Sequence, residues 1–328
     1  MFNKKFLIFL ISCFFCSAIY LGDKNNQDLE YKQLQKNISE KCNSLKTGLI
    51  GVSAYHIESK KWVNCNADEF YPMASTYKLQ IAAYCLSLVD KKQINLQEKY
   101  KIKTLDLQRG STIKKGQQMS IAELIKLMIE KSKNDASDII LRMVGGPDHV
   151  NNWLKTNGFN NMSVDRSVLE MLDNYHGVNS VNSRKLHSIN QDIKLINSVT
   201  VQNRSKALQK FYVDKKDTTT PKEMVNFLTQ LFEKKLLSED STNFLLQSML
   251  KCHWGKEKIP GLLPQGTKIW HKTGRMDKIT SDVGIVELPK NKGHLVIALY
   301  TNKSKSSIDI QERKMAQISK LLFDYFSK

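Results

Sequence analysis

Residues 75–78 read Ser-Thr-Tyr-Lys and open an apolar pattern with helical spacing. Positions three apart share one face of a helix, so the Lys78 amine could take the proton of the Ser75 hydroxyl and make it a nucleophile. Backbone N–H groups at the start of that helix would stabilise the oxyanion formed when Ser75 attacks a carbonyl. The spacing alone is weak evidence, because residues 111–114 and 248–251 share it.

Two further motifs supply groups that could move a proton and bind a substrate. Ser132 and Asn134, one residue apart in a helical region, offer a second hydroxyl and a side-chain amide. Lys272, Thr273 and Gly274 follow a segment with strand character. There the lysine and threonine could bind a carboxylate, while the glycine lets a substrate backbone lie against the strand edge. Because each motif also occurs elsewhere in the chain, the evidence lies in their order and surroundings.

Strand-like segments lie at both ends of the chain, and the middle is mostly helical. The strand-like segments are 49–58, 61–64, 267–271, 282–288 and 294–302. From 76 to about 251 the apolar residues repeat at three and four, and a final amphipathic helix is predicted over 310–326. Since antiparallel strands can pair across a long insertion, we expect an α+β fold, with a mixed antiparallel sheet flanked by helices and an inserted all-α lobe.

The predicted domain boundaries follow this division. A discontinuous sheet lobe takes 23–70 and 260–328, and the all-α lobe takes 71–259 with an insertion at about 166–216. Within that insertion, residues 173–216 are rich in Asn, Ser and Lys and have the weakest periodicity. They are predicted to form a long surface excursion.

The N-terminus predicts export. Residues 1–22 have a basic tip followed by an apolar run from 6 to 19, the layout of a secretory signal peptide. One alternative is a lipoprotein signal, because residues 10–13 resemble a lipobox ending at Cys13. The other is a retained membrane anchor, for which the run is short. We therefore expect the periplasm or cell envelope, a location that argues against nucleic acid as a partner.

Composition sets further limits. The chain has 328 residues, 41% of them hydrophobic, and a formal net charge of +18, which excludes a disordered or collagen-like protein. Beyond the predicted signal peptide, four scattered cysteines have neither a disulfide-scaffold nor a zinc-site spacing. They are Cys42, Cys65, Cys85 and Cys252. No metal or other cofactor is expected, and their disulfide state stays open. The excess positive charge fits a solvated face near an anionic envelope surface.

The motif set resembles that of the penicillin-recognising serine enzymes, which use Ser-x-x-Lys, Ser-x-Asn and Lys-Thr-Gly in this order. The surroundings are similar to class A β-lactamases in five segments: 70–74, 143–147, 217–221, 261–264 and 270–271. The resemblance covers roughly 49–326. It implies a mixed sheet lobe and an all-α lobe with the active site between them.

The resemblance implies a role for each catalytic position. Ser75 would be the acylated nucleophile and Lys78 its general base, while Ser132 would pass a proton to the β-lactam nitrogen. The backbone N–H groups of Ser75 and Arg275 would form the oxyanion hole. Together these groups suffice for acylation, the first half of the reaction.

The binding positions are implied in the same way. Asn134 would hold the amide of the acyl side chain, Lys272 and Thr273 would bind the drug carboxylate, and Gly274 would lie beside the substrate. The expected partner is a small β-lactam or a peptidoglycan-type peptide, and the protein is expected to be a monomer.

The departures from class A fall on the omega loop, which carries the glutamate that activates water for deacylation. Aligned through residues 164–166, that glutamate position is Val168, and the usual asparagine four residues later is Leu172. The asparagine that braces this loop becomes Asp138. The stretch from Arg166 to Pro221 is also about 35 residues longer than the family usually has.

Three hypotheses remain open at this point. Glu170 or Asp138 could have moved into the water-activating position, which gives a β-lactamase with a rebuilt loop. Alternatively no base exists, and the protein acylates but turns over slowly, as a penicillin-binding or D,D-peptidase-like protein or drug sensor. Loss of a general base costs about 10²–10⁴-fold in rate, which separates these two. The third hypothesis is a non-catalytic module that docks on the cell envelope.

Overall fold

A five-stranded antiparallel sheet joins the two ends of the chain in the computed structural model, which describes residues 28–45, 47–108, 111–179 and 189–328. The strand order is β2-β1-β9-β8-β7. The bounds are β1 Leu49–His56, β2 Lys61–Cys65, β7 Ile269–Met276, β8 Ile279–Glu287 and β9 His294–Asn302. Because β1 pairs with β9 along its whole length, the predicted sheet built from both ends of the chain is confirmed.

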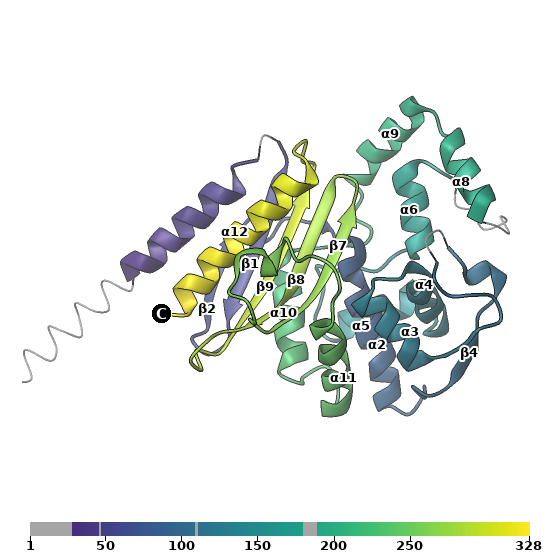
Figure 1. Cartoon of the computed structure of the whole chain (residues 1–328), viewed down its shortest axis with the longest axis horizontal. Helices are drawn as coiled ribbons and strands as arrows, with labels where there is room; N and C mark the ends of the chain where they lie inside the picture. Colours follow the sequence, from purple (N-terminus) through teal and green to yellow (C-terminus); the bar gives the residue numbers. More distant parts are fainter. Residues whose placement is uncertain (1–27, 46, 109–110, 180–188) are drawn as a thin grey trace, which may run out of the picture.

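Helices cover both faces of this sheet (Figure 1). A helix over 28–42 and α12, Ile308–Phe326, lie on one face, and α10, Pro221–Phe232, packs against β1 and β9 on the other. Alternate residues of β9 enter two separate cores. Those on the α12 side are Leu295, Ile297 and Leu299, and those on the other side are Val296, Ala298 and Tyr300. Burial of both faces explains the continuous apolar run of this strand.

The second lobe is built around α2, Lys78–Asp90, whose residues from Lys78 to Ser87 are all buried. The helices around it are α3 Ile121–Glu130, α4 Asn134–Met143, α5 Pro147–Thr156 and α11 Glu239–Leu250, and α6, Val168–His176, packs against α4. Short 3-10 helices are η1 Ala74–Tyr77, η2 Thr104–Asp106 and η3 Ile259–Leu262. Since α2 is enclosed on all sides, its first turn is a rigid platform for Lys78.

This lobe is not entirely α-helical. Strands β3, Tyr71–Pro72, and β6, Thr218–Thr219, pair with each other, as do β4, Lys99–Lys101, and β5, Gln118–Ser120. These short strand pairs provide hydrogen-bond partners for backbone N–H and C=O groups in the segments that connect the helices. Helical periodicity in the sequence does not predict such pairs.

The predicted surface excursion is helical where the structure describes it. Helices α8, Ile189–Ser198, and α9, Val201–Phe211, project beside α6 (Figure 1). Most α9 side chains are exposed. Phe211 is the buried residue of α9, and α9 packs along α6.

The predicted signal peptide and Cys13 lie outside the described residues. Among the residues that are described, no helix has both the length and the apolar character needed to cross a membrane.

Candidate active site

Ser75 lies on η1, the short 3-10 helix that leads directly into α2. The carbonyl of Met73 accepts hydrogen bonds from Thr76 Oγ1 and from Ser281 Oγ on β8, which fixes η1 against the sheet. Strand β7 passes so close that a Cβ at Gly274 would lie 2.9 Å from the Ser75 nitrogen and 2.7 Å from the Met73 oxygen. Only glycine permits this approach, because any side chain at position 274 would collide with backbone.

Lys78, the first residue of α2, is fully buried and joins the first motif to the second. Its Nζ donates to the Ser132 carbonyl at 2.7 Å and to Asn134 Oδ1 at 2.8 Å, and lies 3.4 Å from Ser132 Oγ. Burial, reinforced by the charge of Lys272, holds the pKa of Lys78 well below its ordinary value. A lowered pKa increases the share of neutral amine, which is the form that a general base needs.

Ser132 occupies the turn between α3 and α4 rather than a helix, with a φ of 57°. This left-handed conformation corrects the expectation of a helical setting and is uncommon for a residue other than glycine. In this conformation the Ser132 carbonyl faces Lys78 and the Ser132 hydroxyl faces Lys272.

Lys272 brings the third motif into the same cluster. It is fully buried on β7, and its Nζ donates to Ser132 Oγ at 2.9 Å and to the Thr273 carbonyl at 2.7 Å. Burial lowers the pKa of Lys272 to about 8. The Ser132 hydroxyl therefore lies between two lysine amines, an arrangement suited to passing a proton. Ser75, Lys78, Ser132, Asn134 and Lys272 are called the three-motif cluster below.

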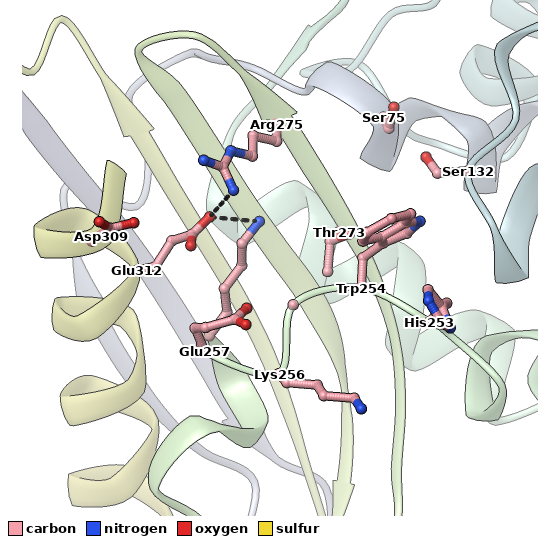
Figure 2. Close-up of a pocket in the computed structure, with 12 residues that line it drawn as sticks. Ser75, Ser132, His253, Trp254, Lys256, Glu257, Thr273, Arg275, Asp309 and Glu312 are labelled. Carbon is pink, nitrogen blue, oxygen red and sulfur yellow. Dashed lines mark ion pairs between the residues drawn. The ribbon is translucent and has the colours of Figure 1, made fainter. Parts of the chain in front are cut away.

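A cavity of about 570 Å³ opens beside this cluster (Figure 2). Its lining includes Ser75, Ser132, Thr273 and Arg275, and continues over His253 and Trp254 and along the segment that follows. Because β7 is the edge strand of the sheet, alternate backbone groups of β7 face away from β8 and are available to a bound molecule.

Lys258 and Glu312 both line the cavity and form a buried ion pair. Lys258 Nζ is 3.5 Å from Glu312 and donates to the carbonyls of Gly274 and Ser281, both at 3.1 Å. Arg275 lies 4.0 Å from the same carboxylate. Lys258 thus ties β7 and β8 to α12 behind the cavity.

The start of α6 is held by Asp138. Its Oδ1 accepts from the Val168 N–H at 2.6 Å, and its Oδ2 accepts from the Leu169 N–H at 3.1 Å and from Gln108 Nε2 at 2.6 Å. Burial raises the pKa of Asp138 despite these donors. The carboxylate therefore braces the helix N-terminus, where a negative charge is favourable. Val168 itself is buried and has no group that accepts a proton.

Glu170 belongs to a capping box at the same helix end. Its Oε2 accepts from both the backbone N–H and the hydroxyl of Ser167, each at 3.0 Å, while Ser167 Oγ accepts from the Glu170 N–H. The Ser-x-x-Glu spacing at 167–170 is a sequence signal for this cap. The structure thus gives the Glu170 carboxylate a structural partner.

A buried ion pair closes the long loop that contains α6, α8 and α9. Arg166 Nε donates to Asp217 Oδ2 at 2.6 Å, and Asp217 Oδ1 accepts from the backbone N–H groups of Asp165 and Arg166. Arg166 also donates to Asp214 and Asn174. We call this contact between Arg166 and Asp217 the loop neck.

The structure therefore brings Lys78, Ser132, Asn134 and Lys272 together by contact, and Ser75 lines the adjoining cavity with Ser132, Thr273 and Arg275. The sequence analysis did not identify Gln108, Trp254, Lys258 or Glu312. A buried lysine such as Lys258 has no signal that separates it from the other basic residues. In the described ranges, no group of three or more His, Cys, Asp or Glu residues could hold a metal ion, and the four cysteines there are free.

Comparisons with known proteins identify the family of this chain. The model of the Beta-lactamase enzyme family matches residues 32–326. The chain is 25% identical to Beta-lactamase VEB-1 of Pseudomonas aeruginosa over 98% of both chains, and 25% identical to Beta-lactamase SME-1 of Serratia marcescens over 97% of this chain and 96% of that one. The crystal structure of the TLA-3 extended-spectrum beta-lactamase superposes with a TM-score of 0.74 at 29% identity, covering 90% of this chain and 99% of that chain.

Proposed function

This chain belongs to the class A branch of the Beta-lactamase enzyme family, and from that premise we propose that it opens β-lactam rings through an acyl-enzyme on Ser75 and releases the product slowly. The observation that carries the proposal is the Ser132 hydroxyl placed between the amines of Lys78 and Lys272. That contact connects all three motifs around one potential proton path.

Acylation begins with proton transfer from Ser75 to the neutral amine of Lys78. The Ser75 oxygen attacks the β-lactam carbonyl, and the backbone N–H groups of Ser75 and Arg275 stabilise the oxyanion. Ser132 then donates its proton to the β-lactam nitrogen as the C–N bond breaks, and recovers one from the lysines beside it. The product is an ester between Ser75 and the opened drug.

Substrate binding uses the remaining predicted residues. Lys272 and Thr273 bind the drug carboxylate, Asn134 holds the acyl amide, and Gly274 lets the drug lie along the edge of β7. Thr273 and Arg275 line the same cavity as Ser75, which supports this orientation.

In this proposal, deacylation is the step for which the described residues offer no dedicated group. Val168 stands where the family carries its water-activating glutamate, and Asp138 and Glu170 each accept hydrogen bonds from the start of α6. Without a base for water, hydrolysis of the ester falls by about 10²–10⁴-fold. The protein would then behave as a penicillin-binding or D,D-peptidase-like protein, with a peptidoglycan-type peptide as a second substrate class.

Incubation with a penicillin tests both halves of the proposal. Intact mass should show a persistent adduct on Ser75, while absorbance at the β-lactam band shows hydrolysis much slower than acylation. Rapid turnover would refute slow deacylation, and its loss in Glu170→Gln or Asp138→Asn would identify the base. Absence of any adduct would favour the non-catalytic envelope module.

We also propose export to the periplasm or cell envelope, on the basis of residues 1–22. The alternative is a lipoprotein that is lipidated on Cys13. Fractionation of cells, together with the mass of the mature N-terminus, distinguishes cleavage from lipidation and from a retained anchor.

A further inference from the structure

Trp254 carries the only large apolar side chain among the described residues that line the cavity beside Ser75 (Figure 2). The other lining residues are serine, threonine, glycine, histidine or charged residues. Trp254 is also 54% exposed, so its ring is accessible from the cavity. Pockets for small molecules usually combine apolar or aromatic side chains with a few polar groups. Here a single indole has to supply that apolar contact.

The indole is held in place by the end of α3. Trp254 Nε1 donates to the Lys131 carbonyl at 3.1 Å, and the backbone N–H of His253 donates to the Glu130 carbonyl at 2.9 Å. The His253 ring packs almost perpendicular to the indole, with centroids 4.9 Å apart and 89° between the ring planes. Because the one polar atom of the indole already has a partner, the ring is a fixed apolar surface. Such preorganisation lowers the entropy cost of binding a ligand.

Gly255 holds the same segment against β7. Its φ is 84°, and a Cβ at this position would lie 2.4 Å from Thr273 Cγ2. Glycine permits both the left-handed backbone and this close approach. The segment that carries Trp254 is therefore fixed to Thr273 through Gly255, and to the residue before Ser132 through the indole nitrogen.

These two contacts indicate which part of a substrate would meet the ring. In the proposed function, Thr273 binds the drug carboxylate and Ser132 protonates the β-lactam nitrogen. The acyl amide is assigned to Asn134, which is not among the residues that line this cavity. A group attached beside the drug carboxylate would therefore reach Trp254, whereas the acyl side chain extends toward Asn134.

We propose that Trp254 is a specificity-determining residue that favours substrates with a flat aromatic group beside the ring carboxylate. The inference rests on the proposed function for the direction in which the drug lies. An aromatic group packed on the indole removes a large apolar area from water and gains offset or edge-to-face ring contacts. A small saturated group at the same position gains less. The preference should therefore show as a difference between two drugs that share their acyl side chain.

Nitrocefin and cephalothin test this preference, because both carry a thienylacetyl side chain and differ beside the carboxylate. Nitrocefin has an aromatic dinitrostyryl group there, and cephalothin has an acetoxymethyl group. Ser75→Ala forms no ester, so calorimetry on that variant measures the affinity for each intact drug. Addition of Trp254→Ala should weaken nitrocefin binding about tenfold and cephalothin binding less than about threefold. Trp254→Phe, which keeps a ring and loses the N–H, should retain most of the preference for nitrocefin.

Phe70→Ala is the control, because Phe70 is an exposed aromatic residue outside the cavity lining. It should leave both affinities unchanged. Equal weakening of both drugs in Trp254→Ala would reduce the ring to a brace for the α3 end and overturn the proposal. An unchanged nitrocefin affinity, or no nitrocefin binding to the Ser75→Ala protein, would overturn it as well. Failure of the proposed function is a separate result, since it would show as the absence of a penicillin adduct on protein that retains Ser75.

Discussion

The three-motif cluster and the start of α6 both contain buried or half-buried polar side chains, but their hydrogen bonds differ in kind. In the cluster, Lys78 and Lys272 direct their amines to Ser132, so side chains from three separate elements meet. At α6, the carboxylates of Asp138 and Glu170 accept from backbone N–H groups of the helix end. The amines and the hydroxyl of the cluster remain able to exchange protons, whereas the carboxylates at α6 position a helix.

This difference suggests that the two half-reactions of a serine hydrolase can be separated in structure. Acylation depends on convergence of several elements, so the loss of any member is severe. Deacylation depends on one acceptor near the ester, and here the expected position is the buried Val168. The following variants test that separation in order of decreasing effect.

Replacement of the nucleophile gives the largest effect. Ser75→Ala should abolish both the penicillin adduct and hydrolysis, because no other hydroxyl takes the position of Ser75 on η1. The thermal midpoint should change little, since Lys78 bonds to the second motif. An adduct that persists on another residue would show that the nucleophile is misassigned.

Lys78→Met keeps the length of a buried side chain and removes the amine. Acylation, followed as the rate of adduct formation, should fall by about 10²–10⁴-fold because the base is lost. A decrease of less than tenfold would mean that Ser75 is activated by another group.

The loop neck predicts a change in stability. Arg166→Ala leaves the buried Asp217 carboxylate without its main partner, and breaking a buried pair costs about 3–5 kcal/mol. Urea denaturation measures this cost, with Asp217→Asn in the same background as the control. A loss below about 1 kcal/mol would show that the neck does not hold the loop.

Val168→Glu should supply a base for the deacylation that we propose to be slow. Hydrolysis of a preformed penicillin adduct should accelerate by about 10²-fold, the low end of general-base catalysis, because the new carboxylate must share the site with Asp138. Val168→Gln has the same size and cannot take the proton, so it should leave the rate unchanged. Equal acceleration in both variants would point to loosening of α6 instead.

The smallest expected effect is the pH dependence of acylation that Lys272 causes. Its pKa is about 8, so the amine is charged below that pH and neutral above it. Acylation by a carboxylate-bearing drug should therefore fall about fivefold between pH 8 and pH 9, whereas Lys272→Arg should not show this decrease because arginine stays charged. The same decrease in the arginine variant would assign it to another group.

Sequence reasoning predicted the sheet, because the strands at both chain ends alternate clearly. The Ser-x-x-Lys spacing predicted Ser75 and Lys78 at one helix start, and the structure places them where η1 leads into α2. Sequence reasoning failed for α9, whose mostly exposed side chains leave no apolar stripe to detect. The contact between His271 and Asp282 becomes visible only through the pairing of β7 with β8.

The loop neck has a consequence for how this protein could be engineered. Because Arg166 and Asp217 are hydrogen-bonded, the chain leaves and re-enters the lobe at one point, and the segment between them can change length without moving its ends. Loop-closure entropy rises by only about 0.6 kcal/mol for each doubling of length. The exposed turn between α8 and α9 is therefore a suitable place to graft a foreign domain.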